Sequence, residues 1–124
     1  MRGIIAIILI LFMFGCSYKD VTITGRVYKD QNKNDKYDNG EPQLPGVLVQ
    51  SGNLQTRTAN DGSFSITGKI VGNDAEIKLF FSKEGYKIQI IKVVIQPGGE
   101  GETEISFYDL NDNPLNEIVM QSNN

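Results

Sequence analysis

The chain has 124 residues, of which 40% are hydrophobic and 22% charged, so it is long enough to build one globular domain. Its formal net charge is −3 and it has no basic run, which argues against nucleic acid as a partner because phosphate backbones are bound by clustered cations. With no His and a single Cys, it lacks the parts for intrachain disulfides, the usual zinc sites and His-dependent nucleophilic catalysis.

The first 15 residues have the pattern of an export signal. After a short positive start, residues 4–14 form an unbroken apolar run, and this run is shorter than the roughly 20 residues that a transmembrane helix needs. The Met-Phe-Gly-Cys segment that ends at Cys16 resembles the lipobox of bacterial lipoproteins, although its Met and Phe depart from the commonest form. The resemblance implies cleavage before Cys16 and lipid attachment to its sulfur.

We therefore expect a lipoprotein signal peptide over residues 1–15, a lipid-anchored linker over 16–20, and a location at the bacterial cell envelope, facing the periplasm or the cell surface. Two or more acyl chains on one cysteine give stable membrane attachment, whereas a single chain binds only marginally. The alternative is an ordinary signal peptide that leaves Cys16 as a free thiol.

Seven segments of the remaining chain have the composition or the alternation of β-strands. In the first, residues 21–28, the side chains of Val21, Ile23 and Val27 fall on one face, which we expect to be buried. The other six segments are residues 47–49, 54–58, 63–66, 77–82, 87–96 and 103–108.

Two turns are predicted between these segments. Asn60-Asp61-Gly62 predicts a hairpin between the strands that flank it, and residues 83–86 predict a second hairpin. Apolar residues do not recur at helical spacing after the leader. We expect an all-β fold, a seven-stranded antiparallel β-sandwich over residues 21–108, with residues 109–124 as an edge strand or a loose tail.

A long polar loop separates the first two predicted strands, and its 12 residues from Asp30 to Glu41 carry side-chain oxygens at positions 1, 3, 5, 9 and 12. These are the ligand positions of an EF-hand loop, in which the backbone carbonyl of position 7 also binds Ca²⁺. Asp35 stands at position 6, where an EF-hand has glycine, and no helices flank the loop. The predicted calcium ligands are Asp30, Asn32, Asn34, the carbonyl of Lys36, Asp38 and Glu41.

The affinity predicted for this site is weak, with a dissociation constant on the order of 10⁻⁴ to 10⁻³ M, because neighbouring lysines offset its three carboxylates. The alternative interpretation is a solvated connection without metal, since Asn and Asp favour turns through hydrogen bonds of their own.

The order of these features resembles a family of surface domains. The loop ends in Gly40-Glu41-Pro42, is followed by Leu44-Pro45-Gly46-Val47, and leads to the turn within Thr58–Phe64. This order is similar to the B-type repeats of serine-aspartate repeat surface proteins and to carboxypeptidase regulatory-like domains. The resemblance covers residues 21 to about 108 and implies a transthyretin-like (prealbumin-like, Cna-B-like) sandwich without catalytic activity.

The function expected from the sequence is that of a non-catalytic envelope lipoprotein with a structural, adhesive or accessory role, which contacts an envelope or surface protein. One alternative is a polysaccharide-binding surface module, although the five tyrosines are scattered and Trp is lacking. Another is an accessory subunit of an envelope enzyme or transporter.

Overall fold

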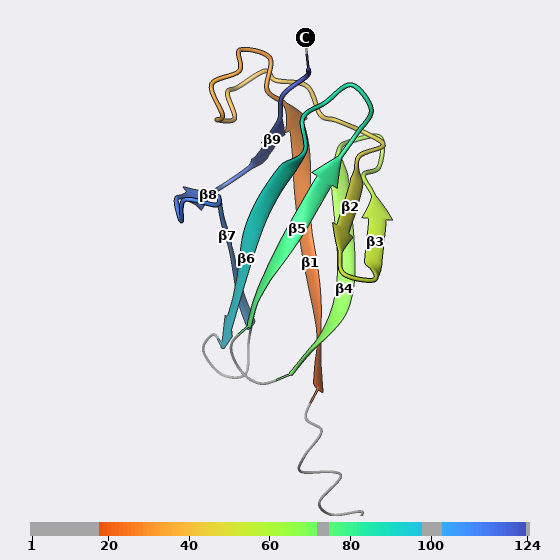
Figure 1. Ribbon diagram of the computed structural model, residues 1–124, viewed down its shortest axis with the longest axis vertical. Coiled ribbons are helices and arrows are strands. Elements are labelled where there is room, and N and C mark those ends of the chain that lie inside the picture. The colour runs from red at the N-terminus through yellow and green to blue at the C-terminus, as the bar shows by residue number, and fades with distance from the viewer. Residues whose placement is uncertain (1–17, 72–74, 98–102, 124) are drawn as a thin grey trace, which may run out of the picture.

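The computed structural model describes residues 18–71, 75–97 and 103–123 (Figure 1). The predicted leader and Cys16 lie outside the described residues. Within the described ranges the chain forms β-strands, and no helix there could cross a bilayer. The strands are β1 (Tyr18–Lys29), β2 (Leu48–Ser51), β3 (Leu54–Arg57), β4 (Ser63–Val71), β5 (Ala75–Ser82), β6 (Gln89–Pro97), β7 (Thr103–Tyr108), β8 (Pro114–Leu115) and β9 (Ile118–Met120).

The strands belong to two sheets, with the orders β4-β1-β9 and β3-β2-β5-β6-β7-β8. In the smaller sheet β1 pairs antiparallel with β4 and parallel with β9, while every pairing in the larger sheet is antiparallel. The predicted all-β class and two-sheet arrangement are confirmed. The described residues contain nine strands rather than seven, because the segment after β7 adds β8 and β9.

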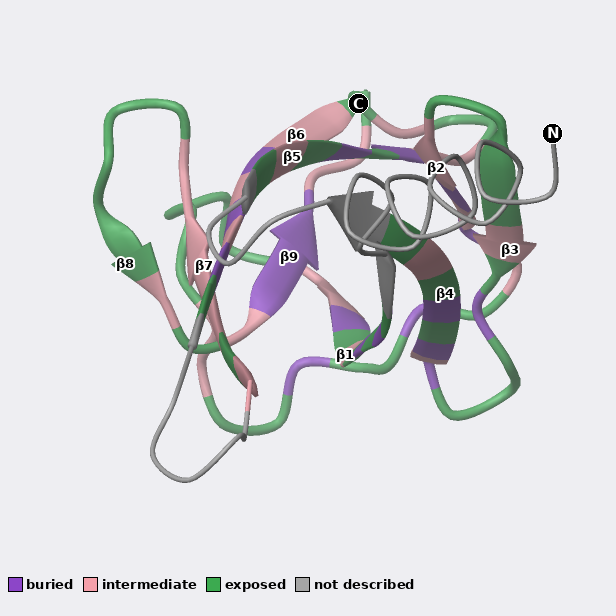
Figure 2. Cartoon of the chain, turned by 90° about the horizontal axis from the view of Figure 1, so that it is seen from below, coloured by how far each residue is buried: buried purple, intermediate pink, exposed green. Residues whose placement is uncertain are grey.

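The core lies between the sheets, and Figure 2 shows buried, purple segments in strands of both, among them β1 and β9 of the smaller sheet and β5 of the larger. Val21, Ile23 and Val27 are all buried on the inner face of β1, as their alternation predicts. The rings of Phe64 on β4 and Phe81 on β5 meet across the core in an edge-to-face contact, with centroids 5.5 Å apart. Burying one such side chain stabilises the fold by about 1.5–3 kcal/mol.

The turn at Asn60-Asp61-Gly62 is present, since Gly62 N donates to Ala59 O at 2.9 Å. The strands on either side nevertheless belong to different sheets, β3 to the larger and β4 to the smaller. The predicted hairpin is therefore wrong, and the turn instead carries the chain from one sheet to the other. The second predicted hairpin is confirmed, because β5 and β6 pair antiparallel around the turn at residues 83–86.

The two ends of the domain differ. In Figure 1, β1 starts at the lower end and reaches the upper end, where residues 30–44, the β5–β6 turn and the last residues gather. A strand of 12 residues is roughly 36 Å long, at about 3.3 Å per residue. The polar loop thus lies a full strand length away from the start of β1.

Candidate metal centre

The loop that contains the predicted calcium ligands is fixed to the sheets at both ends. Lys29 N donates to Pro42 O at 2.8 Å and closes its base. Asp30 N donates to Met120 O at 2.9 Å, which ties the first loop residue to β9. The loop therefore starts and ends at defined places in the fold.

Asp30, the first predicted ligand, is only 1% exposed. Its Oδ1 accepts Asn34 N at 3.3 Å, and its Oδ2 accepts Asp35 N at 2.7 Å and Gln121 Nε2 at 3.2 Å. Burying a carboxylate is costly unless it is hydrogen-bonded, and these three donors meet that requirement. The two backbone donors also hold the loop in a turn around the Asp30 side chain.

Asp35 occupies the position where an EF-hand has glycine, and its φ of 64° lies in the left-handed region. Aspartate and asparagine enter this region more readily than most residues. Its Oδ1 also accepts Gln121 Nε2 at 2.6 Å. Asp35 therefore adopts the left-handed backbone conformation that glycine adopts at this position of an EF-hand loop.

Three of the predicted ligands converge on one point. Asn32 Nδ2 and Asn34 Nδ2 donate to the same oxygen, Asp38 Oδ2, at 2.8 and 2.7 Å. These two hydrogen bonds lower the pKa of Asp38, because they stabilise its charged form. Turning both amides over would bring two amide oxygens and the Asp38 carboxylate together, at the loss of the bond that Asn34 Oδ1 accepts from Lys36 N.

The last two predicted ligands support this arrangement. Glu41 is 8% exposed, and its carboxylate accepts Gln31 N on Oε2 and Asp38 N on Oε1, both at 2.8 Å. Lys36 N donates to Asn34 Oδ1 at 3.0 Å, which places the Lys36 backbone beside the convergent amides. One hydrogen-bond network thus links all six predicted residues, although Glu41 already uses both oxygens as a brace.

Two partners of this loop come from outside it and were not predicted. Gln121 bridges Asp30 and Asp35, from which it is separated by 91 and 86 residues. Tyr37 packs on Tyr28 of β1, with ring centroids 4.2 Å apart and planes inclined by 41°. The contacts of Gln121 depend on how distant segments are brought together. Tyr28 and Tyr37 are close in the sequence, and they meet because the loop turns back toward the end of β1.

The donor set is of a mixed kind. Across residues 18–71, 75–97 and 103–123, no three Asp, Glu, His or Cys side chains are grouped as metal ligands would be. The convergent point instead combines one carboxylate with two amides. Carboxylate, amide and backbone carbonyl oxygens are hard ligands, which suit Ca²⁺ rather than the softer transition metals.

Comparisons with known proteins yield no relative for this chain. No family model matches it, and neither a curated protein nor a solved structure matches it. The functional conclusions therefore rest on the residues and the geometry of the chain itself.

Proposed function

We propose that this chain is a calcium-stabilised, non-catalytic module of the bacterial cell envelope, with a transthyretin-like sandwich in a structural or protein-interaction role. The observation that supports it best is the convergence of Asn32 and Asn34 on Asp38 in a loop braced by two buried carboxylates. Calcium takes six to eight oxygen ligands. The ligands would be Asp30, Asn32, Asn34, Asp38, Glu41 and the carbonyl of Lys36.

Calcium would contribute rigidity. Ordering a polar loop costs conformational entropy, and an ion that binds only the ordered loop offsets that cost. Lys33 and Asp35 both have left-handed backbone angles, so this loop is held in a conformation that most residues avoid. Because Gln121 joins the loop to the segment after β9, a stiffened loop would also secure the last strand.

Thermal unfolding in 1 mM Ca²⁺ and in chelator tests this role. With a dissociation constant near 10⁻⁴ M, calcium adds about 1.4 kcal/mol to the free energy of unfolding, or roughly 6 °C in melting temperature. Mg²⁺ should give a smaller shift, since it demands a tighter octahedral geometry.

Matched variants locate the effect. Asp38→Asn keeps the shape but removes the charge at the convergent point, so it should abolish the calcium shift. Asp61→Asn removes a carboxylate from a different turn, where it accepts Ser63 N at 3.0 Å, and should leave the shift intact. Equal melting of the unmodified protein in calcium and in chelator would leave the loop a solvated connection without metal.

Membrane attachment is the second part of the proposal. It is supported by the apolar run and the lipobox-like segment that ends at Cys16. Cells grown with a fatty-acid probe should label the protein, and Cys16→Ser should abolish the label and release the domain from membranes. Label that persists in Cys16→Ser would exclude this residue as the anchor.

A protein of the envelope or cell surface is the partner that this proposal implies, including an enzyme or transporter to which the chain would be an accessory. Cross-linking in living cells, followed by identification of the linked neighbours, tests it. Recovery of the protein without a reproducible envelope neighbour would count against an interaction role.

A further inference from the structure

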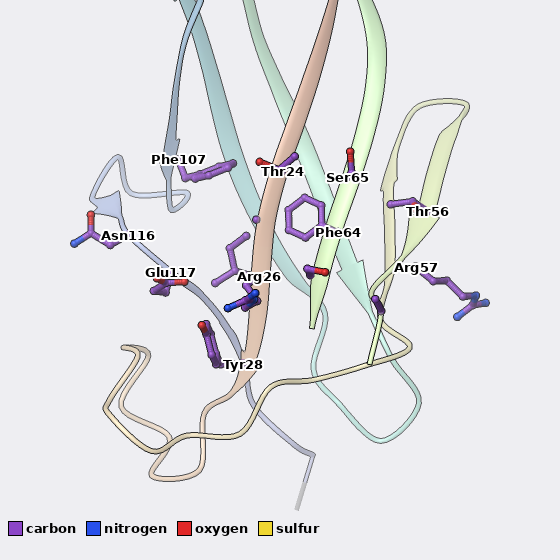
Figure 3. Close-up of a pocket in the computed structure, with 14 residues that line it drawn as sticks. Thr24, Arg26, Tyr28, Thr56, Arg57, Phe64, Ser65, Phe107, Asn116 and Glu117 are labelled. Atoms are coloured by element: carbon purple, nitrogen blue, oxygen red, sulfur yellow. The ribbon is translucent and has the colours of Figure 1, made fainter. Parts of the chain in front are cut away.

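An open groove of about 780 Å³ runs beside β1 of the smaller sheet. Figure 3 shows Thr24, Arg26 and Tyr28 along β1 and Asn116 and Glu117 on the segment that leads to β9, with further polar side chains on β3 and β4. Its polar lining includes Thr24, Arg26, Tyr28, Ser63, Asn116 and Glu117. Its volume lies within the range of about 300–1,000 Å³ that is common for small-molecule sites.

The position of these side chains follows from strand alternation. Because Val21, Ile23 and Val27 point into the core, the even-numbered residues of β1 point away from it. Arg26 and Tyr28 therefore lie on the outer face of the sheet, where a ligand can reach them. Thr24 continues the same row.

Arg26 has an acidic neighbour in the turn after β3. Its Nη2 lies 3.4 Å from Asp61 Oδ2, and the pKa of Arg26 is raised by interaction with the Tyr28 side chain and by attraction to Asp61. Glu117 adds a weaker attraction. The groove thus presents a guanidinium, a carboxylate, an amide and hydroxyls, which can donate and accept several hydrogen bonds at once.

An aromatic surface adjoins these polar groups. Tyr28 lines the groove, and Tyr37 packs against it with ring centroids 4.2 Å apart. Two tyrosines are thus brought together by the fold. A tyrosine ring offers a flat apolar face and a polar edge, so it suits a ligand that is itself apolar on one face and hydroxylated at its rim.

We infer that this groove binds an uncharged oligosaccharide. A sugar ring has the required apolar face and hydroxylated rim, and an open groove accommodates a chain of such rings. The charges disfavour an anionic ligand, because Asp61 and Glu117 balance Arg26 and Arg57 and the whole chain carries −3. This role is separate from calcium binding and goes beyond a purely structural module.

Calorimetric titration of the protein tests the inference. The probes are hexasaccharides of β-1,4-linked glucose and of β-1,4-linked N-acetylglucosamine, with a hexasaccharide of galacturonic acid as the anionic contrast. Binding of at least one neutral hexasaccharide more tightly than the anionic one is expected. Failure of both neutral probes to bind at millimolar concentration, or tighter binding of the anionic one, would overturn the inference.

Four variants test whether binding takes place in the groove. Tyr28→Ala should weaken binding at least about tenfold, whereas Tyr28→Phe, which keeps the ring, should stay within about threefold. Phe80→Ala removes a 40% exposed ring from the outer face of the larger sheet and should not change binding. Glu117→Ala, on the groove but not in the core, should also weaken binding, and it keeps the test decisive if Tyr28→Ala does not fold. Equal losses in Phe80→Ala and Tyr28→Ala would contradict the assignment.

Discussion

Replacement of Glu41 by Gln separates the bracing role of this residue from its predicted role as a calcium ligand. The buried carboxylate accepts two backbone N–H bonds at 2.8 Å, from Gln31 and Asp38. Glutamine has the same shape but only one acceptor oxygen, so its NH₂ group would face one of the two donors. A hydrogen bond to a charged group contributes about 1.5–3 kcal/mol to stability. We therefore expect Glu41→Gln to lower the free energy of unfolding of the metal-free protein by about 2 kcal/mol.

Thermal unfolding in chelator, followed by circular dichroism, measures this loss without any contribution from calcium. For a domain of this size, about 2 kcal/mol corresponds to a melting temperature lower by roughly 8 °C. Glu104→Gln is the matched control, because Glu104 is exposed on β7, and its effect should stay within about 0.5 kcal/mol. An unchanged melting temperature for metal-free Glu41→Gln would show that the carboxylate is no brace and would refute the reasoning.

Other predictions concern the same end of the domain and its turns. Gln121→Ala removes the amide that bridges Asp30 and Asp35, so hydrogen exchange of β9 should accelerate and stability should fall by about 1 kcal/mol. The pKa of Asp38 is lowered by folding, so its stabilisation is complete above the ordinary aspartate pKa of about 3.9 and is lost as pH falls through the lowered value. Asp38→Asn should therefore flatten the fall in melting temperature below about pH 4. Gly62→Ala places a Cβ 2.6 Å from Val27 O at a φ of 79° and should cost more than about 2 kcal/mol. Gly52→Ala meets open space at a φ of 58° and should cost only about 1–2 kcal/mol, so equal losses would rule out the steric argument.

Local patterns predicted what depends on neighbouring residues alone. The alternation around Ile23 identified the buried face of β1, because side chains of any strand point to opposite sides in turn. The oxygen-rich spacing from Asp30 to Glu41 identified residues that do meet in one network. The buried face of a strand and the contacts within one loop both depend on residues less than about a dozen positions apart, and local sequence patterns predict features of this range.

Distant pairing was the part that the sequence did not reveal. The Asn60-Asp61-Gly62 turn reverses the chain, but its residues do not determine which sheet the next strand joins. Strand β9 is only three residues long and lies between polar segments, yet it pairs with the end of β1 and all three of its side chains are buried. The contacts of Gln121 with the loop depend on that pairing and were missed for the same reason.

The place of β1 in its sheet also sets the order in which the domain can fold. This first strand lies between β4 and β9, and Val27 pairs with Ile118, so the last three residues of β1 have no strand neighbour on that side until β9 is available. Contacts of such long sequence separation form slowly. The smaller sheet is therefore completed late in folding, because the strand that closes it, β9, is the one farthest from β1 in the sequence.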